Sequence, residues 1–230
     1  MGRIRFLLLF CLCYYQTASS QTMASKKISY LALGDSYTIG ESVPALENFP
    51  HQTVQLLTQK GFTVQSPTII AKTGWTTDEL NDGISNAGLD KEYDFVSLLI
   101  GVNNQYRGKS KDEYAEQFAQ LLKKSIRLAA NNPSHVIVVS IPDWGATPFA
   151  EGRDRNKIAQ EIDAFNAINK RIALTNNVHY IDITPGSREA SFDETLLAND
   201  KLHPSAKEYK RWAVKVGEVI EDLIKLQEKK

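Results

Sequence analysis

The sequence predicts an α/β fold, a three-layer α/β/α sandwich around a central, mainly parallel sheet of five strands. Two observations lead to this prediction: short apolar runs alternate with longer amphipathic segments, and glycine or polar residues follow most of the apolar runs. Such alternation is typical of βαβ units, whose crossover helices cover both faces of a parallel sheet. The chain has 230 residues, of which 42% are hydrophobic, enough to bury one substantial core.

The apolar runs have the composition of strands that are buried on both faces. The first run leads directly into Gly34, Asp35 and Ser36, and the third is almost wholly apolar and ends at Gly101. Parallel strands read as near-continuous apolar runs because helices cover both of their sides. We therefore expect strands over residues 28–33, 62–71, 94–100, 135–141 and 178–183.

The segments between these runs carry apolar residues at helical spacing. Asn48 can cap the start of the first helix, and Gly61 follows its end as a stop signal. Pro204 suits the first turn of the last helix, in which Trp212 is expected to be a core residue. We expect helices over residues 49–59, 76–80, 112–130 and 156–174, and from 204 toward the charged C-terminus.

The N-terminal segment differs from the rest of the chain. Arginines precede an apolar run that ends at Cys13, and small residues lead to Ser20, a pattern typical of a secretory signal peptide. The run is much shorter than the roughly 20 residues that span a bilayer. We therefore expect a signal peptide over 1–20, a single domain over 21–230, and a secreted, periplasmic or cell-envelope protein with no integral membrane span.

Lipid attachment at the N-terminus is disfavoured. Cys11 and Cys13 are preceded by the bulky Phe10 and Leu12, where lipoprotein processing needs a small residue. Because both cysteines lie in the expected signal peptide, the mature chain would contain neither a disulfide nor a thiol nucleophile.

Composition and spacing argue against several classes of function. Lys plus Arg and Asp plus Glu both number 27, so no basic excess draws the chain to nucleic acid. The histidines His51, His135 and His179 lack metal-ligand spacing, and no glycine-rich phosphate loop occurs. We expect no metal, no cofactor and no nucleic-acid partner, and the sequence leaves the oligomeric state open.

Residues with catalytic chemistry follow the expected strands. In a parallel sheet the ligand cleft lies beyond the carboxyl ends of the strands, so these residues share one edge. They are Gly34, Asp35 and Ser36 after the first strand, Thr73, Gly74 and Trp75 after the second, Gly101 to Asn104 after the third, and Asp200 to His203 after the fifth. Each group alone could be a turn or a helix cap. Together they supply a nucleophile, a base, an acid and an amide.

These residues fit one catalytic mechanism. A serine hydroxyl needs a base to take its proton during attack, and His203 suits this task at neutral pH. Asp200, three residues earlier, can accept the other ring N–H and fix the tautomer of the histidine. The backbone N–H groups of Ser36 and Gly74 and the side-chain amide of Asn103 can form an oxyanion hole. The sequence therefore predicts hydrolysis of carboxylic esters through an acyl-enzyme.

The four segments resemble, in order and at typical separations, the four sequence blocks of the SGNH (GDSL-type) hydrolases, over nearly all of the mature chain. The resemblance implies a flavodoxin-like sheet, a nucleophile at Ser36, oxyanion donors at Gly74 and Asn103, and the Asp-x-x-His pair at Asp200 and His203. One position departs from the pattern. The third block usually ends in aspartate, whereas this chain has Asn104, which puts in question the hydrogen bonds that an acid would accept there.

The substrate stays open between several classes at this stage. Carboxylic ester hydrolysis in general competes with three narrower alternatives: lysophospholipase or thioesterase activity, O-deacetylation of a glycan, and a non-catalytic carbohydrate-binding role. Trp75, Tyr106 and Trp144 follow strand ends and are expected either to line the substrate pocket or to cover the edge of the sheet. Arg107 is a weaker candidate for contact with an anionic group. Residues 143–155 are long enough to form a flap over the cleft.

Overall fold

The computed structural model describes residues 27–89 and 91–228, so the expected signal peptide lies outside the described residues. Its five strands form one sheet in the order β2-β1-β3-β4-β5, and every pairing is parallel. This order is the one typical of flavodoxin-like sheets. The strands are β1 (Tyr30–Asp35), β2 (Thr68–Lys72), β3 (Phe95–Leu99), β4 (Val136–Val139) and β5 (His179–Ile181).

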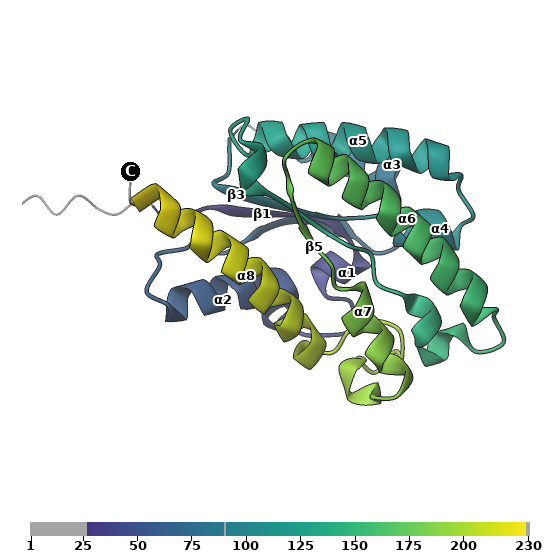
Figure 1. The fold of residues 1–230 in the computed structure, drawn as a ribbon. Coiled ribbons are helices and arrows are strands. Elements are labelled where there is room, and N and C mark those ends of the chain that lie inside the picture. The colour runs from purple at the N-terminus through teal and green to yellow at the C-terminus, as the bar shows by residue number, and fades with distance from the viewer. Residues whose placement is uncertain (1–26, 90, 229–230) are drawn as a thin grey trace, which may run out of the picture.

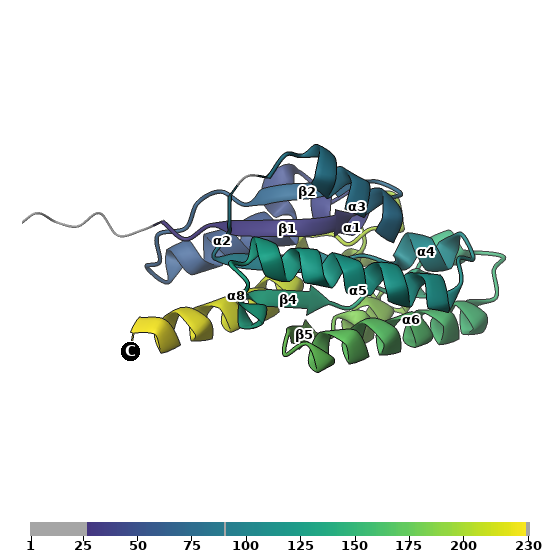
Figure 2. The ribbon, with the colours of Figure 1, turned by 90° about the horizontal axis from the view of Figure 1, so that it is seen from above.

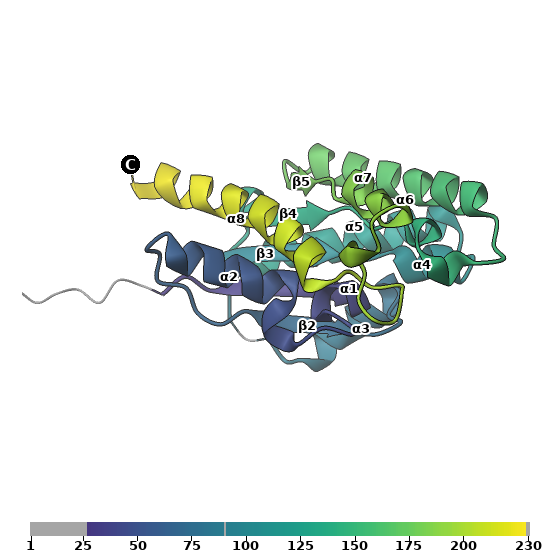
Figure 3. The same cartoon turned by 90° about the horizontal axis from the view of Figure 1, so that it is seen from below.

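Helices cover both faces of the sheet and complete three layers (Figure 1). Figure 2 shows α3 (Thr77–Asn86), α5 (Lys111–Leu128) and α6 (Arg155–Thr175) on one face. Figure 3 shows α2 (Phe49–Gln59) and α8 (Ala206–Glu228) side by side on the other. The predicted α/β/α fold is confirmed, and the short helices α1 (Ser36–Ile39), α4 (Val102–Tyr106) and α7 (Thr184–Ser187) all lie at strand ends.

Several element boundaries differ from the expected ones. The second strand begins at Thr68 instead of 62, because Pro67 has no N–H to donate to the ladder, and the preceding segment meets the sheet only through a bridge between Val64 and Ile28. The last helix begins at Ala206, two residues after Pro204, which instead pairs with Leu197 in a short antiparallel bridge. The helix α4 has no counterpart among the expected helices.

The helix α3, which the sequence predicts to open over residues 76–80, begins at Thr77 and continues to Asn86. Its N-terminus carries a capping box, in which the side chains of Thr76 and Glu79 each bond the other's backbone. Gly83 lies inside the helix because the ring of Trp75 packs against it: a Cβ at Gly83 would lie 2.2 Å from Cη2 of Trp75.

Two aromatic clusters anchor the layers to the sheet. Trp212 of α8 is buried, as expected, and packs against the rings of Phe49 and Tyr209. On the opposite face, Tyr114 packs against Phe118 and Phe165 and donates a hydrogen bond to the carbonyl of Ile100. Among the described residues, no helix has the length and apolar character needed to cross a bilayer.

Candidate active site

Ser36 is the first residue of α1 and follows β1 without a linker. The turn between strand and helix requires glycine at position 34, because a Cβ there would lie 2.1 Å from Oγ1 of Thr38 and 2.5 Å from the carbonyl oxygen of Leu99. The carboxylate of Asp35 caps the helix by accepting the N–H of Tyr37 at 3.0 Å. As residue N1 of a helix, Ser36 has a backbone N–H that no intrahelical carbonyl accepts.

The structure brings Ser36, His203 and Asp200 into one line of hydrogen bonds. Nε2 of His203 lies 2.9 Å from Oγ of Ser36, and its Nδ1 lies 2.6 Å from Oδ2 of Asp200. The other carboxylate oxygen of Asp200 accepts the backbone N–H groups of Leu202 and His203 at 3.0 and 2.9 Å. Both Ser36 and His203 are buried, with 5% and 6% of their surface exposed. This geometry is that of a nucleophile, a base and an orienting acid.

The carboxylate of Asp200 also accepts a hydrogen bond from Ser42, which the sequence did not point to. Oγ of Ser42 lies 2.7 Å from Oδ2 of Asp200. Burial acts to raise the pKa of Asp200, but the hydrogen bonds from His203 and Ser42 outweigh burial and hold this pKa at about 2. Asp200 is therefore ionised at any pH at which the imidazole can act as a base.

Gly74 and Asn103 border the same pocket as Ser36. Gly74 follows β2 with φ at +84°, a conformation that favours glycine. The Nδ2 group of Asn103 donates to the carbonyl of Trp75 at 3.0 Å and lies 3.5 Å from Oδ2 of Asp35. These contacts fix the amide at the edge of the pocket, where it can serve as a donor.

Arg107 contacts the protein rather than facing the pocket as a free cation. Its Nη2 donates to the carbonyl of Gly74 at 2.6 Å, and its Nη1 donates to Glu79 at 3.3 Å. Arg107 therefore braces the turn that presents Gly74, which is a role the sequence did not indicate.

Asn104, which stands where the family pattern has aspartate, uses both the oxygen and the nitrogen of its side-chain amide in hydrogen bonds. Its Oδ1 accepts the backbone N–H of Thr77 at 3.1 Å, and its Nδ2 donates to Oγ1 of Thr77 at 2.7 Å. The hydroxyl of Thr77 donates in turn to Gln117. Because that hydroxyl is already used as a donor, an amide suits this fully buried position better than an acid.

A pocket of about 160 Å³ opens above Ser36. Tyr106, Trp144 and Phe149 form one wall, with ring centroids 5.2 to 6.3 Å apart. Trp144 is held by a hydrogen bond from its Nε1 to Gln105 at 2.7 Å. The pocket is lined by Ser36, Tyr37, Thr73, Gly74, Val102, Asn103, Tyr106, Trp144, Phe149, Leu202 and His203.

Two expectations about this pocket need correction. Trp75 does not border it, because its ring packs on Gly83 of α3 instead. The segment 143–155 is not a loose flap along its whole length. Its first part forms two 3₁₀ turns, Trp144–Ala146 and Pro148–Ala150, and is anchored by buried Asp143, which pairs with Arg188 at 2.9 Å. Phe149, which the sequence analysis had not singled out, comes from this wall.

Comparison with known proteins identifies the family. Residues 32–211 match the model of the GDSL-like Lipase/Acylhydrolase family, and the chain belongs to that family. The resemblance to SGNH hydrolases is thereby confirmed, and the chain is an ester hydrolase. No curated protein matches the chain in sequence.

Solved structures share the fold at low sequence identity. Axe2, an acetylxylan esterase from Geobacillus stearothermophilus, is 21% identical, with a TM-score of 0.67 over 84% of this chain and 94% of that chain. TesA is 15% identical, with a TM-score of 0.66 over 85% of this chain and 99% of that chain. The psychrotrophic esterase EstA from Pseudoalteromonas sp. is 17% identical, with a TM-score of 0.63 over 88% and 99% of the two chains.

Proposed function

We propose that this ester hydrolase cleaves carboxylic esters through an acyl-enzyme on Ser36. The observation that carries the proposal is the unbroken line of hydrogen bonds from Ser36 through His203 to Asp200 at the floor of a pocket. His203 takes the hydroxyl proton as Oγ attacks the ester carbonyl, and Asp200 stabilises the imidazolium that forms.

The oxyanion of the tetrahedral intermediate is stabilised by three donors. These are the backbone N–H groups of Ser36 and Gly74 and the side-chain amide of Asn103. Collapse of the intermediate releases the alcohol, which takes its proton from His203. Water then attacks the acyl-enzyme, with His203 again as the base, and the carboxylic acid leaves.

The lining of the pocket supports an acyl group with some hydrocarbon. Apolar or aromatic side chains, Tyr37, Val102 and Leu202 among them, face the space beside Ser36. Such a lining stabilises a hydrocarbon chain by removing it from water. A small ester with a short aliphatic acyl group is therefore the substrate class we propose first.

Removal of acetyl groups from a glycan is the second candidate. Tyr106 and Phe149 are 46% and 47% exposed at the rim of the pocket, and such rings can stack on the faces of sugars. The acetylxylan esterase Axe2 has the same fold. On this hypothesis, kcat/KM for acetylated xylo-oligosaccharides would exceed kcat/KM for p-nitrophenyl butyrate.

Turnover and labelling of the purified protein test the mechanism. We expect Ser36→Ala to lower kcat for p-nitrophenyl esters by about 10³-fold or more. A fluorophosphonate should add one equivalent to the wild type and none to Ser36→Ala, as read by intact mass. Ser85→Ala, on the exposed surface of α3, serves as the matched control and should label fully. Turnover by Ser36→Ala equal to that of the wild type would remove the mechanism, and a wild type that binds glycans but does not label would indicate a carbohydrate-binding module.

We also propose that the chain is exported, on the strength of the N-terminal pattern alone. Expression of the full chain in a secreting bacterial host should yield a product outside the cytoplasm whose N-terminus is Gln21. Retention of residues 1–20 on the isolated protein would contradict the proposal.

A further inference from the structure

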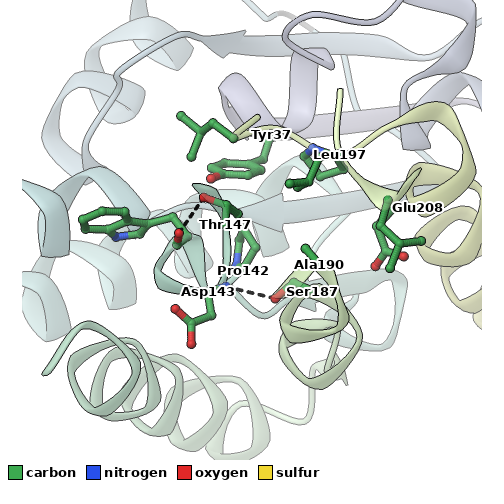
Figure 4. A pocket seen from close by; sticks show the side chains of 12 residues that line it. Tyr37, Pro142, Asp143, Thr147, Ser187, Ala190, Leu197 and Glu208 are labelled. Atoms are coloured by element: carbon green, nitrogen blue, oxygen red, sulfur yellow. Dashed lines mark hydrogen bonds between the residues drawn. The ribbon is translucent and has the colours of Figure 1, made fainter. Parts of the chain in front are cut away.

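A second, small cavity lies beside the catalytic pocket. It measures about 20 Å³ and shares Tyr37, Trp144 and Leu202 with the pocket above Ser36. Figure 4 shows it from close by, with the ring of Tyr37 across the space from Ser187 and Ala190. The two spaces therefore adjoin at these three side chains.

The cavity is apolar in character even though polar residues border it. Pro142, Ala190, Leu196, Leu197, Leu202 and Pro204 supply apolar surface. The hydroxyl groups of Thr147 and Ser187 donate hydrogen bonds to backbone carbonyls of the wall and not into the cavity. Oγ1 of Thr147 donates to the carbonyl of Trp144 at 2.7 Å, and Oγ of Ser187 donates to the carbonyl of Thr184 at 2.8 Å (dashed for Thr147 in Figure 4).

The two carboxylates that border the cavity, those of Glu208 and Asp143, form hydrogen bonds and ion pairs with residues outside it. Glu208 accepts Nε1 of Trp212 at 2.8 Å and a guanidinium N–H of Arg211 at 2.9 Å. Asp143 pairs with Arg188. A small space whose polar neighbours other than the Tyr37 hydroxyl are already hydrogen-bonded favours hydrocarbon over water.

Tyr37 is held firmly between the two spaces. It follows the nucleophile directly, its backbone N–H is bonded to Asp35, and only 3% of its surface is exposed. Its ring packs against the imidazole of His203, with centroids 4.9 Å apart. The ring therefore cannot leave its place without disturbing contacts that also position the nucleophile and the base.

We propose that Tyr37 limits the length of the acyl chain by separating the catalytic pocket from this cavity. The inference rests on the proposed hydrolysis of esters at Ser36. An acyl chain whose carbonyl lies at Ser36 extends inward along the apolar wall until it meets the ring of Tyr37. The cavity behind the ring is then an unused extension of the acyl site, which a smaller side chain at position 37 would open.

The test is the chain-length profile of kcat/KM for p-nitrophenyl esters from acetate to decanoate. In the wild type we expect kcat/KM to fall beyond the short acyl chains. Tyr37→Ala should raise the ratio of kcat/KM for octanoate to that for acetate by about tenfold or more, the gain typical of burying a few methylene groups. The ratio is the readout because loss of the ring contact with His203 lowers the rates for all esters together. Tyr37→Phe keeps the ring and should keep the wild-type ratio.

A second variant fills the cavity from its far side. Ala190 is buried, borders the cavity and does not border the catalytic pocket. Ala190→Val alone should leave turnover of acetate and butyrate esters unchanged. Combined with Tyr37→Ala, it should return the octanoate-to-acetate ratio toward the wild-type value.

Each outcome bears on one proposal. An unchanged ratio in folded Tyr37→Ala, or a gain that persists in the double variant, would overturn the role of Tyr37 while leaving the Ser36 mechanism intact. A wild type that hydrolyses none of the esters would overturn the proposed function instead. If Tyr37→Ala fails to fold, Leu202→Ala opens the same partition from another element and should move the ratio in the same direction.

Discussion

The hydroxyl of Ser42 donates to the carboxylate of Asp200 at 2.7 Å across 158 residues of sequence. Ser42 comes from the turn after α1, where the carbonyl of Ser36 accepts the N–H groups of Gly40 and Glu41 at 3.1 and 3.0 Å. The bond therefore ties the segment that carries Ser36 to the loop that carries Asp200. Ser42 has φ at +65°, a conformation that residues other than glycine adopt rarely and at some cost.

Loss of this hydroxyl should change the pH dependence of catalysis. Without its donor, the pKa of Asp200 rises, and its carboxylate stabilises the imidazolium more strongly. The acid limb of kcat/KM should therefore move to higher pH in Ser42→Ala. The variant also loses the bond that holds the Asp200 carboxylate in place beside His203, and we expect this loss of positioning to dominate and lower kcat by about fivefold, equivalent to about 1 kcal/mol for one partly exposed hydrogen bond. Stopped-flow or steady-state pH profiles measure both effects.

Ser42→Gly separates the hydroxyl from the backbone strain. Glycine adopts the left-handed conformation freely, so this variant should unfold at a higher temperature than Ser42→Ala while showing the same kinetic defect. Normal pH profiles in both variants would mean that the bond to Asp200 does not act on the catalytic groups.

Asp35 should make stability depend on pH. Burial raises the pKa of this carboxyl to about 7, although the backbone N–H of Tyr37 acts in the opposite direction. In the unfolded chain the carboxyl titrates near 4, so between about pH 4 and 7 the folded state holds a proton that the unfolded state has lost. The free energy of unfolding of the wild type should therefore fall as pH rises through this window.

Asp35→Asn removes that titration. Its free energy of unfolding, measured by urea denaturation at pH 4 and pH 8, should gain about 1 kcal/mol or more relative to the wild type on going to the higher pH. An equal pH dependence in both proteins would contradict the raised pKa. The same variant should lose activity, because an amide nitrogen at the position of Oδ2 would face Nδ2 of Asn103.

Replacement of Asn103 should affect the transition state more than substrate binding. The amide is positioned by the carbonyl of Trp75. We expect Asn103→Ala and the isosteric Asn103→Asp to lower kcat by about 10²- to 10³-fold with KM nearly unchanged, as for other oxyanion donors. A rise in KM with normal kcat would place the amide in ground-state binding instead.

Asn104→Asp restores the residue of the family pattern and tests whether the hydrogen-bonding groups around position 104 require an amide. The variant loses the bond from Nδ2 to the hydroxyl of Thr77 and places a carboxyl in a fully buried site. We expect destabilisation by about 1–3 kcal/mol, measured by chemical denaturation. Thr77→Ser keeps the hydroxyl and is the matched control. Wild-type stability in Asn104→Asp would show that this position accepts either residue.

The site could be predicted in outline because its main residues follow strand ends. Parallel strands bring those positions to one edge, so Ser36, Gly74 and Asn103 could be grouped without coordinates. The boundary of β2 differs from the expected one because the segment before Pro67 alternates apolar and polar residues as a strand does, yet it forms only an isolated bridge, between Val64 and Ile28.

The remaining contacts depend on tertiary packing that leaves no local pattern. Ser42 is one hydroxyl in a turn, and its partner lies 158 residues away. Trp75 follows a strand end, as pocket residues do, yet its ring packs against Gly83. The reason for a glycine at position 83 becomes visible only once helix α3 is placed beside that ring. From its place in the sequence, Arg107 could have faced a substrate. In the structure its guanidinium instead donates a hydrogen bond to the carbonyl of Gly74.

The position of the triad along the chain has a consequence for how the enzyme matures. Ser36 directly follows the first strand, whereas His203 comes just before the final helix α8, which packs beside α2. On the mechanism proposed above, a nascent chain that has emerged only through the fifth strand lacks Asp200 and His203, so no base activates its Ser36 hydroxyl. Hydrolysis would then begin only after the C-terminal part has docked, at the last stage of folding.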